Sequence, residues 1–277
     1  MVFKPNQELR KFLDEDLGKG DITSRLLEKK VITAKIITRQ NTIVSGTDFI
    51  KQIFSLKNCK TRIIRKDGME AKPNQTILEI KGDAAAILSC ERTALNLLSR
   101  MCGITTKTNQ LCTLIRKTNS KTKLFATRKT APGLRYFDKA AVEIGGGNKH
   151  RMTLDDMIMF KDNHIATEKS IFELIAKAKK TRKKIEIEVE NNADAILAAT
   201  LGVDIIMLDN FTPKQINNTI KNLQKLNLRK NVKLEASGQI NEKNISQYAK
   251  TGVDMISVGE ITNSVHSIDL SLELTNR

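Results

Sequence analysis

Short apolar segments separated by helix-like stretches recur through the second half of the chain, and this rhythm constrains the fold more than any other feature. Each segment is four or five residues long and rich in Ile, Leu, Val and Met. Strands that alternate with helices are typical of a parallel sheet with helical crossovers. We therefore predict an α/β fold whose parallel strands, about six in number, close into a barrel, with an open doubly wound sheet as the alternative. The expected strands are 123–127, 157–160, 185–189, 204–208, 232–236 and 255–258.

The first 103 residues follow a different pattern. A helix is expected over 6–17, followed by a turn-rich stretch with two glycines. Three β-like runs come next, at 31–46, 61–68 and 75–82, each bounded by Gly, Asp or Pro turn signals. A helix over 84–101 with an apolar stripe at helical spacing closes this half. The chain thus divides into two domains, with a boundary near residue 103.

The chain is strongly basic, with a formal net charge of +16. Such a charge is consistent with nucleic-acid binding, with a pocket for anionic small molecules, or with a basic solvated surface. The densest run, 177–184, closes an expected helix, where cations face the negative end of the helix dipole, so we assign it to the surface. No aromatic residues interleave with these charges to suggest a base-stacking platform.

Other features of the sequence narrow the class of protein. The four cysteines form no CxxC pair, so we expect buried, neutral thiols rather than a zinc site or a disulfide framework. The apolar runs fall short of the roughly 18 residues that span a bilayer, and the first residues resemble neither a signal nor a transit peptide. We therefore expect a soluble cytoplasmic protein.

Charged residues stand directly after four of the six expected strands, which the ordinary polarity of loops explains poorly. In barrels and in open parallel sheets alike, the active site is built beyond the carboxyl ends of the strands. The other two strands run into Ser-Gly and Gly-Glu, whose short side chains leave backbone amides open. The residues concerned are Arg128, Lys129, Lys161, Glu190, Asp209, Ser237, Gly238 and Gly259.

The residue types at these strand ends suit an anionic substrate. Arginine binds a planar carboxylate through two parallel hydrogen bonds, and lysine binds phosphate as a point charge. His150 and Arg151 add two more cationic groups in the same part of the chain. Glu190 and Asp209 can bind ribose hydroxyls or Mg²⁺, or can form salt bridges with neighbouring cations. From the residues alone, the prediction is a site for a ligand with carboxylates and phosphates.

Motifs along nearly the whole chain resemble those of quinolinate phosphoribosyltransferase. In the second half these are TRKTAPGLR (127–135), EIGGGNKHR (143–151), FKDNHI (160–165), EVEN (188–191), LDN (208–210), EASG (235–238) and SVG (257–259). In the first half they are EDLGKGDIT (15–23) and ERTALNLLSRMCGI (91–104). The block from 126 to 165 is the most specific of them.

The resemblance implies an N-terminal α/β sandwich domain over 1–103 and a C-terminal α/β barrel over 104–263, with a tail, 264–277, free to pack back on the first domain. It also implies a homodimer or homohexamer. The implied reaction joins quinolinate to phosphoribosyl pyrophosphate with decarboxylation, giving nicotinate mononucleotide, pyrophosphate and CO₂ for NAD biosynthesis. Neither a nucleic acid nor a membrane is an expected partner.

The resemblance also assigns roles to residues. The group implied to grip the quinolinate carboxylates is Arg92 (from a neighbouring subunit), Arg128, His150, Arg151 and Lys161. The group implied to hold the phosphoribosyl part is Lys129, Glu190, Asp209, Ser237, Gly238, Val258 and Gly259, and Thr127 and Gln239 complete the expected substrate-binding set. Glu190 and Asp209 are the implied Mg²⁺ residues, mostly through substrate and water, and they form the implied catalytic set together with Lys129 and Lys161.

One position departs from the family pattern, and two other functions stay open. Gln239 stands where glycine or asparagine is common, so its side chain could crowd the phosphate loop or add a hydrogen bond. A related transferase acting on nicotinate or another aromatic acid is the first alternative, although five cations suit a dicarboxylate better. A basic nucleic-acid-binding protein is the second, and salt-sensitive binding of generic DNA would support it.

Overall fold

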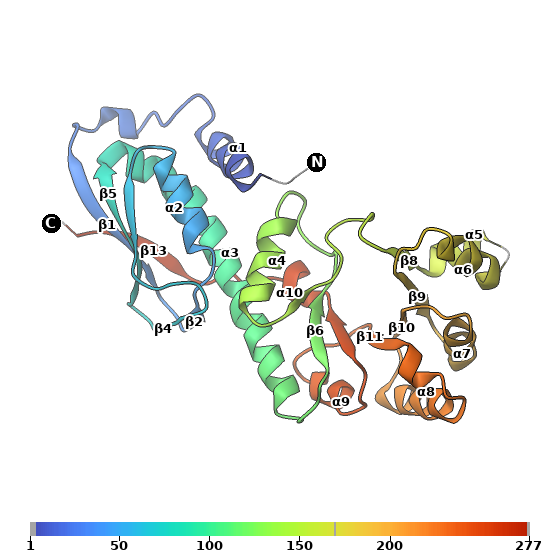
Figure 1. Ribbon diagram of the computed structural model, residues 1–277. Helices are drawn as coiled ribbons and strands as arrows, with labels where there is room; N and C mark the ends of the chain where they lie inside the picture. The colour runs from blue at the N-terminus through green and yellow to red at the C-terminus, as the bar shows by residue number, and fades with distance from the viewer. Residues whose placement is uncertain (1–3, 169, 276–277) are drawn as a thin grey trace. The chain divides into compact units, whose positions relative to one another are not determined.

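A computed structural model describes residues 4–168 and 170–275, which fall into two compact units. The first unit holds residues 4–108, 131–146 and 264–275, and the second holds 109–130, 147–168 and 170–263. Figure 1 shows the elements of each unit along the colour ramp. The predicted division, with its boundary near 103, assigned two segments to the barrel that belong to the first unit, namely 104–108 and 131–146.

The first unit is built on a four-stranded antiparallel sheet in the order β13-β1-β5-β3. Strand β1 buries Ile32, Ala34 and Ile36 on alternate positions, as a sheet with one face on a core requires. The end of the chain supplies an edge strand of this sheet, because Leu272 pairs with Ile36. The strands are β1 (Val31–Thr38), β3 (Lys60–Ile63), β5 (Thr76–Asp83) and β13 (Leu270–Leu274), with a separate pair β2 (Thr42–Ile43) and β4 (Glu70–Ala71).

Helices of the first unit extend beyond those predicted. The predicted helix over 84–101 continues to Arg116 and passes through Gly103. A Cβ at Gly103 would lie 2.2 Å from the backbone oxygen of His266, so this position leaves no room for a side chain. Residues 131–146 belong here because Asp138 is buried against Arg100, at 2.8 Å. The helices are α1 (Pro5–Leu17), η1 (Ser24–Leu26), α2 (Thr47–Ser55), α3 (Ala84–Arg116, which continues into the second unit) and α4 (Arg135–Ile144).

The second unit contains a seven-stranded parallel sheet in the order β7-β6-β12-β11-β10-β9-β8. All six predicted strands are present, and a short seventh strand is added at one edge. Within the described residues no ladder joins β7 to β8, so the sheet curves as an open half-barrel. The strands are β6 (Lys123–Ala126), β7 (Asn148–Lys149), β8 (Ile158–Phe160), β9 (Ile185–Val189), β10 (Ile205–Asp209), β11 (Lys233–Ser237) and β12 (Met255–Val258).

Helices connect these strands and begin at clear sequence signals. Helix α7 is capped by Asn191, whose side chain accepts from the backbone N–H of Asp194 at 2.9 Å. Helix α8 opens with Pro213, behind a reciprocal capping box between Thr212 and Gln215. The helices are α5 (Asp162–Thr167), α6 (Ile171–Lys179), α7 (Asn192–Thr200), α8 (Pro213–Lys225), η2 (Arg229–Asn231), α9 (Ile245–Ala249) and α10 (Glu260–Asn263).

The two faces of the half-barrel differ in character. Ile185, Ile187 and Val189 of β9 are buried on the face that the helices cover. The alternate residues are Glu186 and Glu188, and the parallel register carries this second face across Met207 to Glu235. Because successive side chains of a strand point to opposite faces, one face of the sheet carries carboxylates and hydroxyls. This polar face is the frame on which the site is built.

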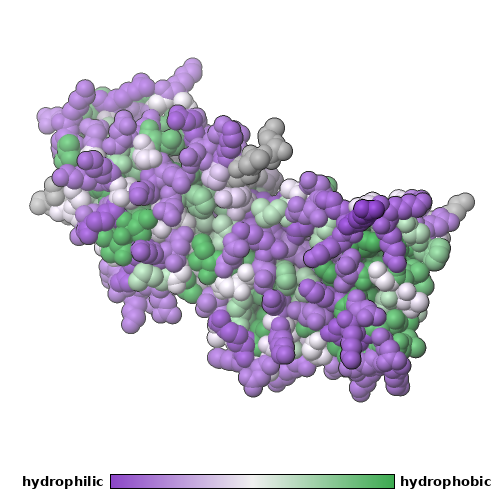
Figure 2. Space-filling view, viewed as in Figure 1, coloured by the Kyte–Doolittle hydropathy of each residue, from purple (hydrophilic) through white to green (hydrophobic). Residues whose placement is uncertain are grey.

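Several bulk expectations can be compared with the structure. All four cysteines are buried and free, as predicted. Charged residues of the run 177–184 are exposed, and Figure 2 shows hydrophilic side chains over most of the visible face. Within the described residues, no helix combines the length and the apolar character needed to cross a bilayer.

Candidate active site

A cavity of about 490 Å³ opens at the carboxyl ends of the half-barrel strands. Residues that directly follow β6, β7 and β8 meet there with residues of β9 to β12, as predicted for a parallel sheet. Many of the side chains that line it are charged. They are Thr127, Arg128, Lys129, His150, Arg151, Met159, Lys161, Asp162, Glu188, Met207, Asp209, Glu235, Ser237 and Ser257.

Two arginines bring buried donors to this cavity. Arg151 is oriented by its Nη1, which donates to the carbonyl oxygens of Met157 at 3.0 Å and Leu154 at 3.3 Å. Burial lowers the pKa of Arg151 from its ordinary value, and the positive charge of Arg128 lowers it further. The Nε atoms of both arginines are buried, and among the described residues neither has a hydrogen-bond partner. Unsatisfied buried donors are costly, so an anion that accepts from both fits this place.

The two lysines of the cavity are held in different ways. The Nζ of Lys161 is hydrogen-bonded to the carboxylate of Glu188 on β9. The backbone of Lys129 is fixed at both ends, because its N–H donates to Thr127 Oγ1 at 3.1 Å and its carbonyl accepts from Thr262 Oγ1 at 2.8 Å. A Cβ at Gly259 would lie 3.1 Å from Cδ of Lys129, so this glycine leaves room for the lysine stem.

Two carboxylates of the cavity have the chemistry to bind a divalent cation. Asp209 ends β10, and its Oδ2 accepts from the side-chain amide of Asn210 at 2.6 Å. Glu188 on β9 pairs with Met207, two residues before Asp209, and is already bound to Lys161. Oxygen donors of this type suit Mg²⁺, which also keeps water and substrate phosphates in its shell. The predicted Glu190 follows β9 as an exposed residue and does not line the cavity, whereas Glu188 does.

The Ser237-Gly238-Gln239 turn after β11 has left-handed backbone. Gly238 has φ of +94°, and a Cβ there would lie 2.8 Å from the backbone nitrogen of Asn210. Gln239 follows with φ of +49°, a conformation that glycine and asparagine adopt more easily. Its side chain is exposed and does not line the cavity, so the family's preference at this position has a backbone explanation.

Other predicted residues lie apart from the cavity lining. Val258 is buried at the end of β12, where only its backbone is available to a ligand, and Gly259 follows it. Arg92 is an exposed residue of α3, in the first unit. Its predicted role depends on a second subunit and stays a prediction.

Sequence reasoning missed four polar residues of the barrel interior. Glu186, Glu188, Glu235 and Ser257 all lie inside strands rather than after them. The sequence did contain a signal for them. A parallel strand that is covered on both faces is expected to be apolar throughout, so charged residues inside such a strand are unusual. The charges that alternate in IEIEV therefore indicate a strand face that lines a polar space.

Three of the interior side chains form one buried cluster. The Nε2 atom of His150 lies 2.9 Å from Oε2 of Glu186 and 3.6 Å from Oε2 of Glu235. The other oxygen of Glu235 accepts from the hydroxyl of Ser257. Burial raises the pKa of Glu235 to about 7, and the negative charge of Glu186 acts in the same direction.

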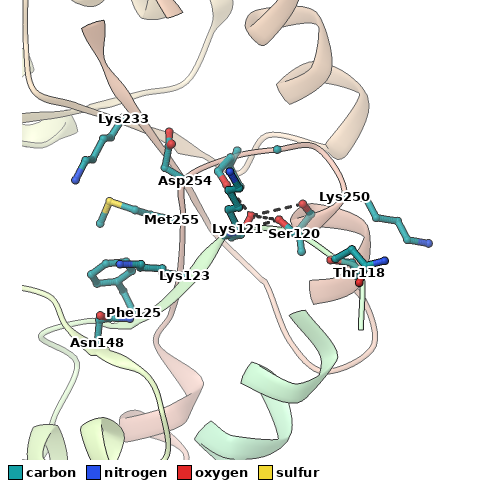
Figure 3. A pocket seen from close by; sticks show the side chains of 15 residues that line it. Thr118, Ser120, Lys121, Lys123, Phe125, Asn148, Lys233, Lys250, Asp254 and Met255 are labelled. Atoms are coloured by element: carbon teal, nitrogen blue, oxygen red, sulfur yellow. Dashed lines mark hydrogen bonds between the residues drawn. The ribbon is translucent and has the colours of Figure 1, made fainter. Parts of the chain in front are cut away.

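A larger cavity, of about 720 Å³, lies near the amino ends of β6, β11 and β12 (Figure 3). Four lysines line it, namely Lys121, Lys123, Lys233 and Lys250. Its one carboxylate, Asp254, already accepts from Arg229 Nη2 at 2.9 Å and from the N–H of Leu234 at 2.8 Å. This second cavity therefore lacks the facing acids and cations that characterise the first.

Comparison with known proteins covers both halves of the chain. The family profile described as "Quinolinate phosphoribosyl transferase, N-terminal domain" matches residues 21–102, and the one described as "Quinolinate phosphoribosyl transferase, C-terminal domain" matches 104–273. A probable nicotinate-nucleotide pyrophosphorylase (carboxylating) of Methanothermobacter thermautotrophicus is 42% identical over 273 residues, which is 96% of this chain and 97% of the relative.

Solved structures give the same result. The nicotinate-nucleotide pyrophosphorylase from Francisella tularensis is 40% identical with a TM-score of 0.90, covering 99% of this chain and 98% of that one. The one from Ehrlichia chaffeensis is 35% identical with a TM-score of 0.92, covering 99% of this chain and 100% of that one.

Proposed function

The chain belongs to the quinolinate phosphoribosyltransferase family, and we propose that quinolinate and phosphoribosyl pyrophosphate meet in the cavity at the carboxyl ends of its half-barrel strands. The family is one of carboxylating nicotinate-nucleotide pyrophosphorylases. The enzyme transfers the phosphoribosyl group to quinolinate with decarboxylation, and the product is nicotinate mononucleotide for NAD biosynthesis.

The observation that carries the placement is the pair of buried guanidinium Nε atoms that have no acceptor among the described residues. They lie in one cavity with Lys161 and His150. A planar dicarboxylate supplies acceptors for several such donors at once, and charge-assisted hydrogen bonds are about twice as strong as neutral ones. We assign the grip on the two quinolinate carboxylates to Arg128, Arg151, His150 and Lys161.

The phosphoribosyl part of the second substrate is assigned to other residues of the cavity and of the turn after β11. Lys129 faces the phosphates, the turn at Ser237 and Gly238 presents backbone and hydroxyl donors, and Asp209 faces the ribose. Glu188 joins Asp209 in this role, because it lines the cavity and Glu190 does not. Asp209 and Glu188 would hold Mg²⁺ mostly through substrate and water. When bound, the ion supplies positive charge that stabilises the departing pyrophosphate.

The reaction needs positioning and charge more than a nucleophilic side chain. The ring nitrogen of quinolinate forms a bond to the anomeric carbon while the bond to pyrophosphate breaks and its electron pair leaves with pyrophosphate. The resulting pyridinium then accepts the electron pair of the breaking carbon–carboxylate bond, and the ring carbon takes up a proton as CO₂ departs. Lys129 stabilises charge on the leaving group, and Asp209 stabilises positive charge on the ribose. Preorganised charges of this kind are a large source of rate enhancement.

The oligomeric state is part of the proposal. Arg92 is exposed on α3, and the resemblance assigns it to the quinolinate site of a neighbouring subunit. A homodimer or a homohexamer would then be required for catalysis.

A direct assay tests the proposed function. Purified protein is mixed with quinolinate, phosphoribosyl pyrophosphate and Mg²⁺, and nicotinate mononucleotide and CO₂ are measured. We expect turnover that depends on all three components. Turnover with nicotinate but none with quinolinate would overturn the substrate assignment, and turnover that survives removal of divalent cations would overturn the magnesium assignment.

The shared site is tested by Arg92→Ala. We expect activity to fall by a factor of about 100, as for loss of a charge-assisted contact to a buried anion, while sedimentation still reports the wild-type oligomer. Arg116→Ala, at an exposed cation of the same helix, is the matched control for loss of one cation from α3. A fully active Arg92→Ala enzyme would contradict a site shared between subunits.

A further inference from the structure

Asn210 ends the LDN motif directly after β10, and the roles assigned above do not include it. Its side chain is exposed and does not line the substrate cavity, whereas the neighbouring Asp209 does. Burial in a core therefore does not explain an asparagine at this position. Any effect of Asn210 on a substrate must pass through the groups that it contacts.

Three contacts join Asn210 to the groups assigned to the phosphoribosyl part. Its Nδ2 donates to Oδ2 of Asp209 at 2.6 Å. Its backbone N–H donates to the carbonyl oxygen of Ser237 at 2.9 Å. Its Oδ1 lies against Gly238, because a Cβ on that glycine would be only 2.3 Å from this oxygen. Asn210 thus lies between the half-buried carboxylate that ends β10 and the turn that follows β11.

We propose that Asn210 is a positioning residue that holds the carboxylate of Asp209 and the Ser237-Gly238 turn at one fixed spacing, so that both ends of a ribose 5-phosphate group are bound together. The inference rests on the proposed function, with Asp209 at the ribose and the turn at the 5′-phosphate. Asn210 itself needs no contact with the substrate.

The backbone at position 210 restricts the type of residue that can stand there. Its φ is +56°, in the left-handed region that glycine adopts readily and asparagine and aspartate tolerate. This conformation redirects the chain after β10, so that Phe211 is buried before Thr212 caps α8. Most other side chains would strain the turn.

The contact with Asp209 adds a second restriction. A carboxylate accepts hydrogen bonds, so the group that faces it must donate. Glycine offers no side-chain donor, and aspartate, with nearly the same shape as asparagine, would place a second carboxylate against the first. Asparagine satisfies both restrictions. Because its nitrogen faces Asp209, its oxygen points toward Gly238.

The parallel register lets one residue reach both groups. Asp209 pairs with Ser237 at the end of the ladder between β10 and β11, so both strands enter their turns at the same level. The turn after β11 is also left-handed, with φ of +94° at Gly238 and +49° at Gln239. The carboxylate and the phosphate turn therefore share one base, and the side chain of Asn210 connects them.

Asn227 provides a matched control within the same unit. Its φ is +57°, and it is an exposed residue between α8 and the amino end of β11, outside the cavity lining. Alanine at either position meets the same backbone strain. We expect Asn210→Ala and Asn227→Ala to lower Tm by similar amounts, so that differences in binding report the side-chain contacts of Asn210.

Calorimetric binding of ribose 5-phosphate to the full chain without metal tests the link, because this probe spans both groups whereas inorganic phosphate needs the turn alone. Asn210→Gly keeps the left-handed backbone accessible and deletes the amide. We expect its affinity for ribose 5-phosphate to fall about 10-fold, as for loss of one hydrogen bond to a charged group, and its affinity for phosphate to fall by less than about 3-fold. Asn227→Gly should change neither affinity.

Asn210→Asp separates the proposed link from a purely structural role. If the residue served only to relieve backbone strain, the aspartate and glycine variants would both bind ribose 5-phosphate like the wild type. With the link, Asn210→Asp should bind it more weakly than Asn210→Gly, because the new carboxylate repels Asp209.

Kinetics and a double-mutant cycle give two further readouts. In Asn210→Gly we expect KM for phosphoribosyl pyrophosphate to rise about 10-fold, with KM for quinolinate changing much less. Combining Asn210→Gly with Asp209→Asn should weaken ribose 5-phosphate binding little beyond Asp209→Asn alone, because residues that act through one another are not additive.

Three results would overturn the inference. Wild-type affinity for ribose 5-phosphate in both Asn210→Gly and Asn210→Asp does so, and it leaves the proposed function intact where quinolinate is still converted. Equal weakening of ribose 5-phosphate and phosphate in Asn210→Gly also does so, since only the turn is then affected. A wild-type protein that binds quinolinate but neither phosphate compound refutes the placement of the phosphoribosyl part, and the inference falls with it.

Discussion

The two ends of the half-barrel present cavities that differ in size and in chemistry. The cavity at the amino ends is the larger, at about 720 Å³ against about 490 Å³. Its lysines face solvent, and its single carboxylate is already bound to Arg229. At the carboxyl ends, cations and acids face one another, and two buried guanidinium nitrogens lack an acceptor among the described residues.

The difference shows that volume and positive charge do not by themselves mark a site. Both ends carry lysines, as expected for a chain of net charge +16. Among the residues that the structure describes, only the carboxyl end has buried polar atoms whose cost of desolvation a ligand would remove. Four predictions test this contrast, in order of decreasing expected effect.

Removing a cation from each end should have very different results. We expect Arg128→Ala to weaken quinolinate binding by a factor of about 100 or more, because a charge-assisted contact to a buried anion is lost. Lys233→Ala, in the larger cavity, should leave the affinity unchanged. Calorimetric titration with quinolinate measures both, and circular dichroism checks that each variant folds. Wild-type affinity in Arg128→Ala would contradict the assignment of the cavity.

Glycines at the two ends provide a second matched pair. Gly238 and Gly252 both have positive φ, at +94° and +82°, but only Gly238 has atoms close to the position of a Cβ. We expect Gly252→Ala to lower the free energy of unfolding by about 1 kcal/mol from backbone strain alone. Gly238→Ala should cost more and should also raise KM for phosphoribosyl pyrophosphate. Equal losses of stability with unchanged kinetics would show that the turn after β11 does not contact substrate.

The buried Glu235 should make stability depend on pH. Its folded pKa, about 7, lies above the ordinary value of 4.5, so the folded state binds more protons between these values. Stability contributed by the protonated form is therefore lost as pH rises from about 4.5 to 7. We expect Glu235→Gln to gain stability relative to the wild type between pH 5 and pH 8, by at most a few kcal/mol. Thermal unfolding at both pH values measures the difference, and a constant difference would contradict it.

The smallest effect is expected at Gln239. Its φ of +49° is unfavourable for a residue with a side chain, and the side chain itself does not line the cavity. Gln239→Gly should raise the free energy of unfolding by up to about 1 kcal/mol, since relief of strain is partly offset by the greater freedom of glycine in the unfolded chain. Denaturant unfolding measures the change, and Lys243→Gly, at an exposed position of the same loop, is the control. A loss of stability would show that the glutamine side chain contributes a contact.

The sequence was sufficient for the fold class and for the end of the sheet where the charged cavity lies. The period and length of the apolar runs identified six of the seven strands of the parallel sheet. Helices α7 and α8 begin at residue types that commonly cap helices, Asn191 and Thr212. Strand β7 was missed because two residues carry no period. Helix α2 was missed because it follows directly on β-like residues. The helix predicted over 84–101 was too short, since α3 continues through Gly103, where a close backbone contact leaves no room for a side chain.

What the sequence determined by itself is therefore local or periodic: elements, their order, and the residues that directly follow strands. Motif resemblance added the reaction, which the comparisons bear out. Tertiary structure decided which carboxylates share one space. Glu186, Glu188 and Glu235 come together only because parallel register aligns alternate residues of β9, β10 and β11 on one face. It also decided that Glu188 rather than Glu190 lines the cavity. Both residues have the parity of the polar face, but β9 ends at Val189, so Glu190 already lies beyond the strand and is exposed.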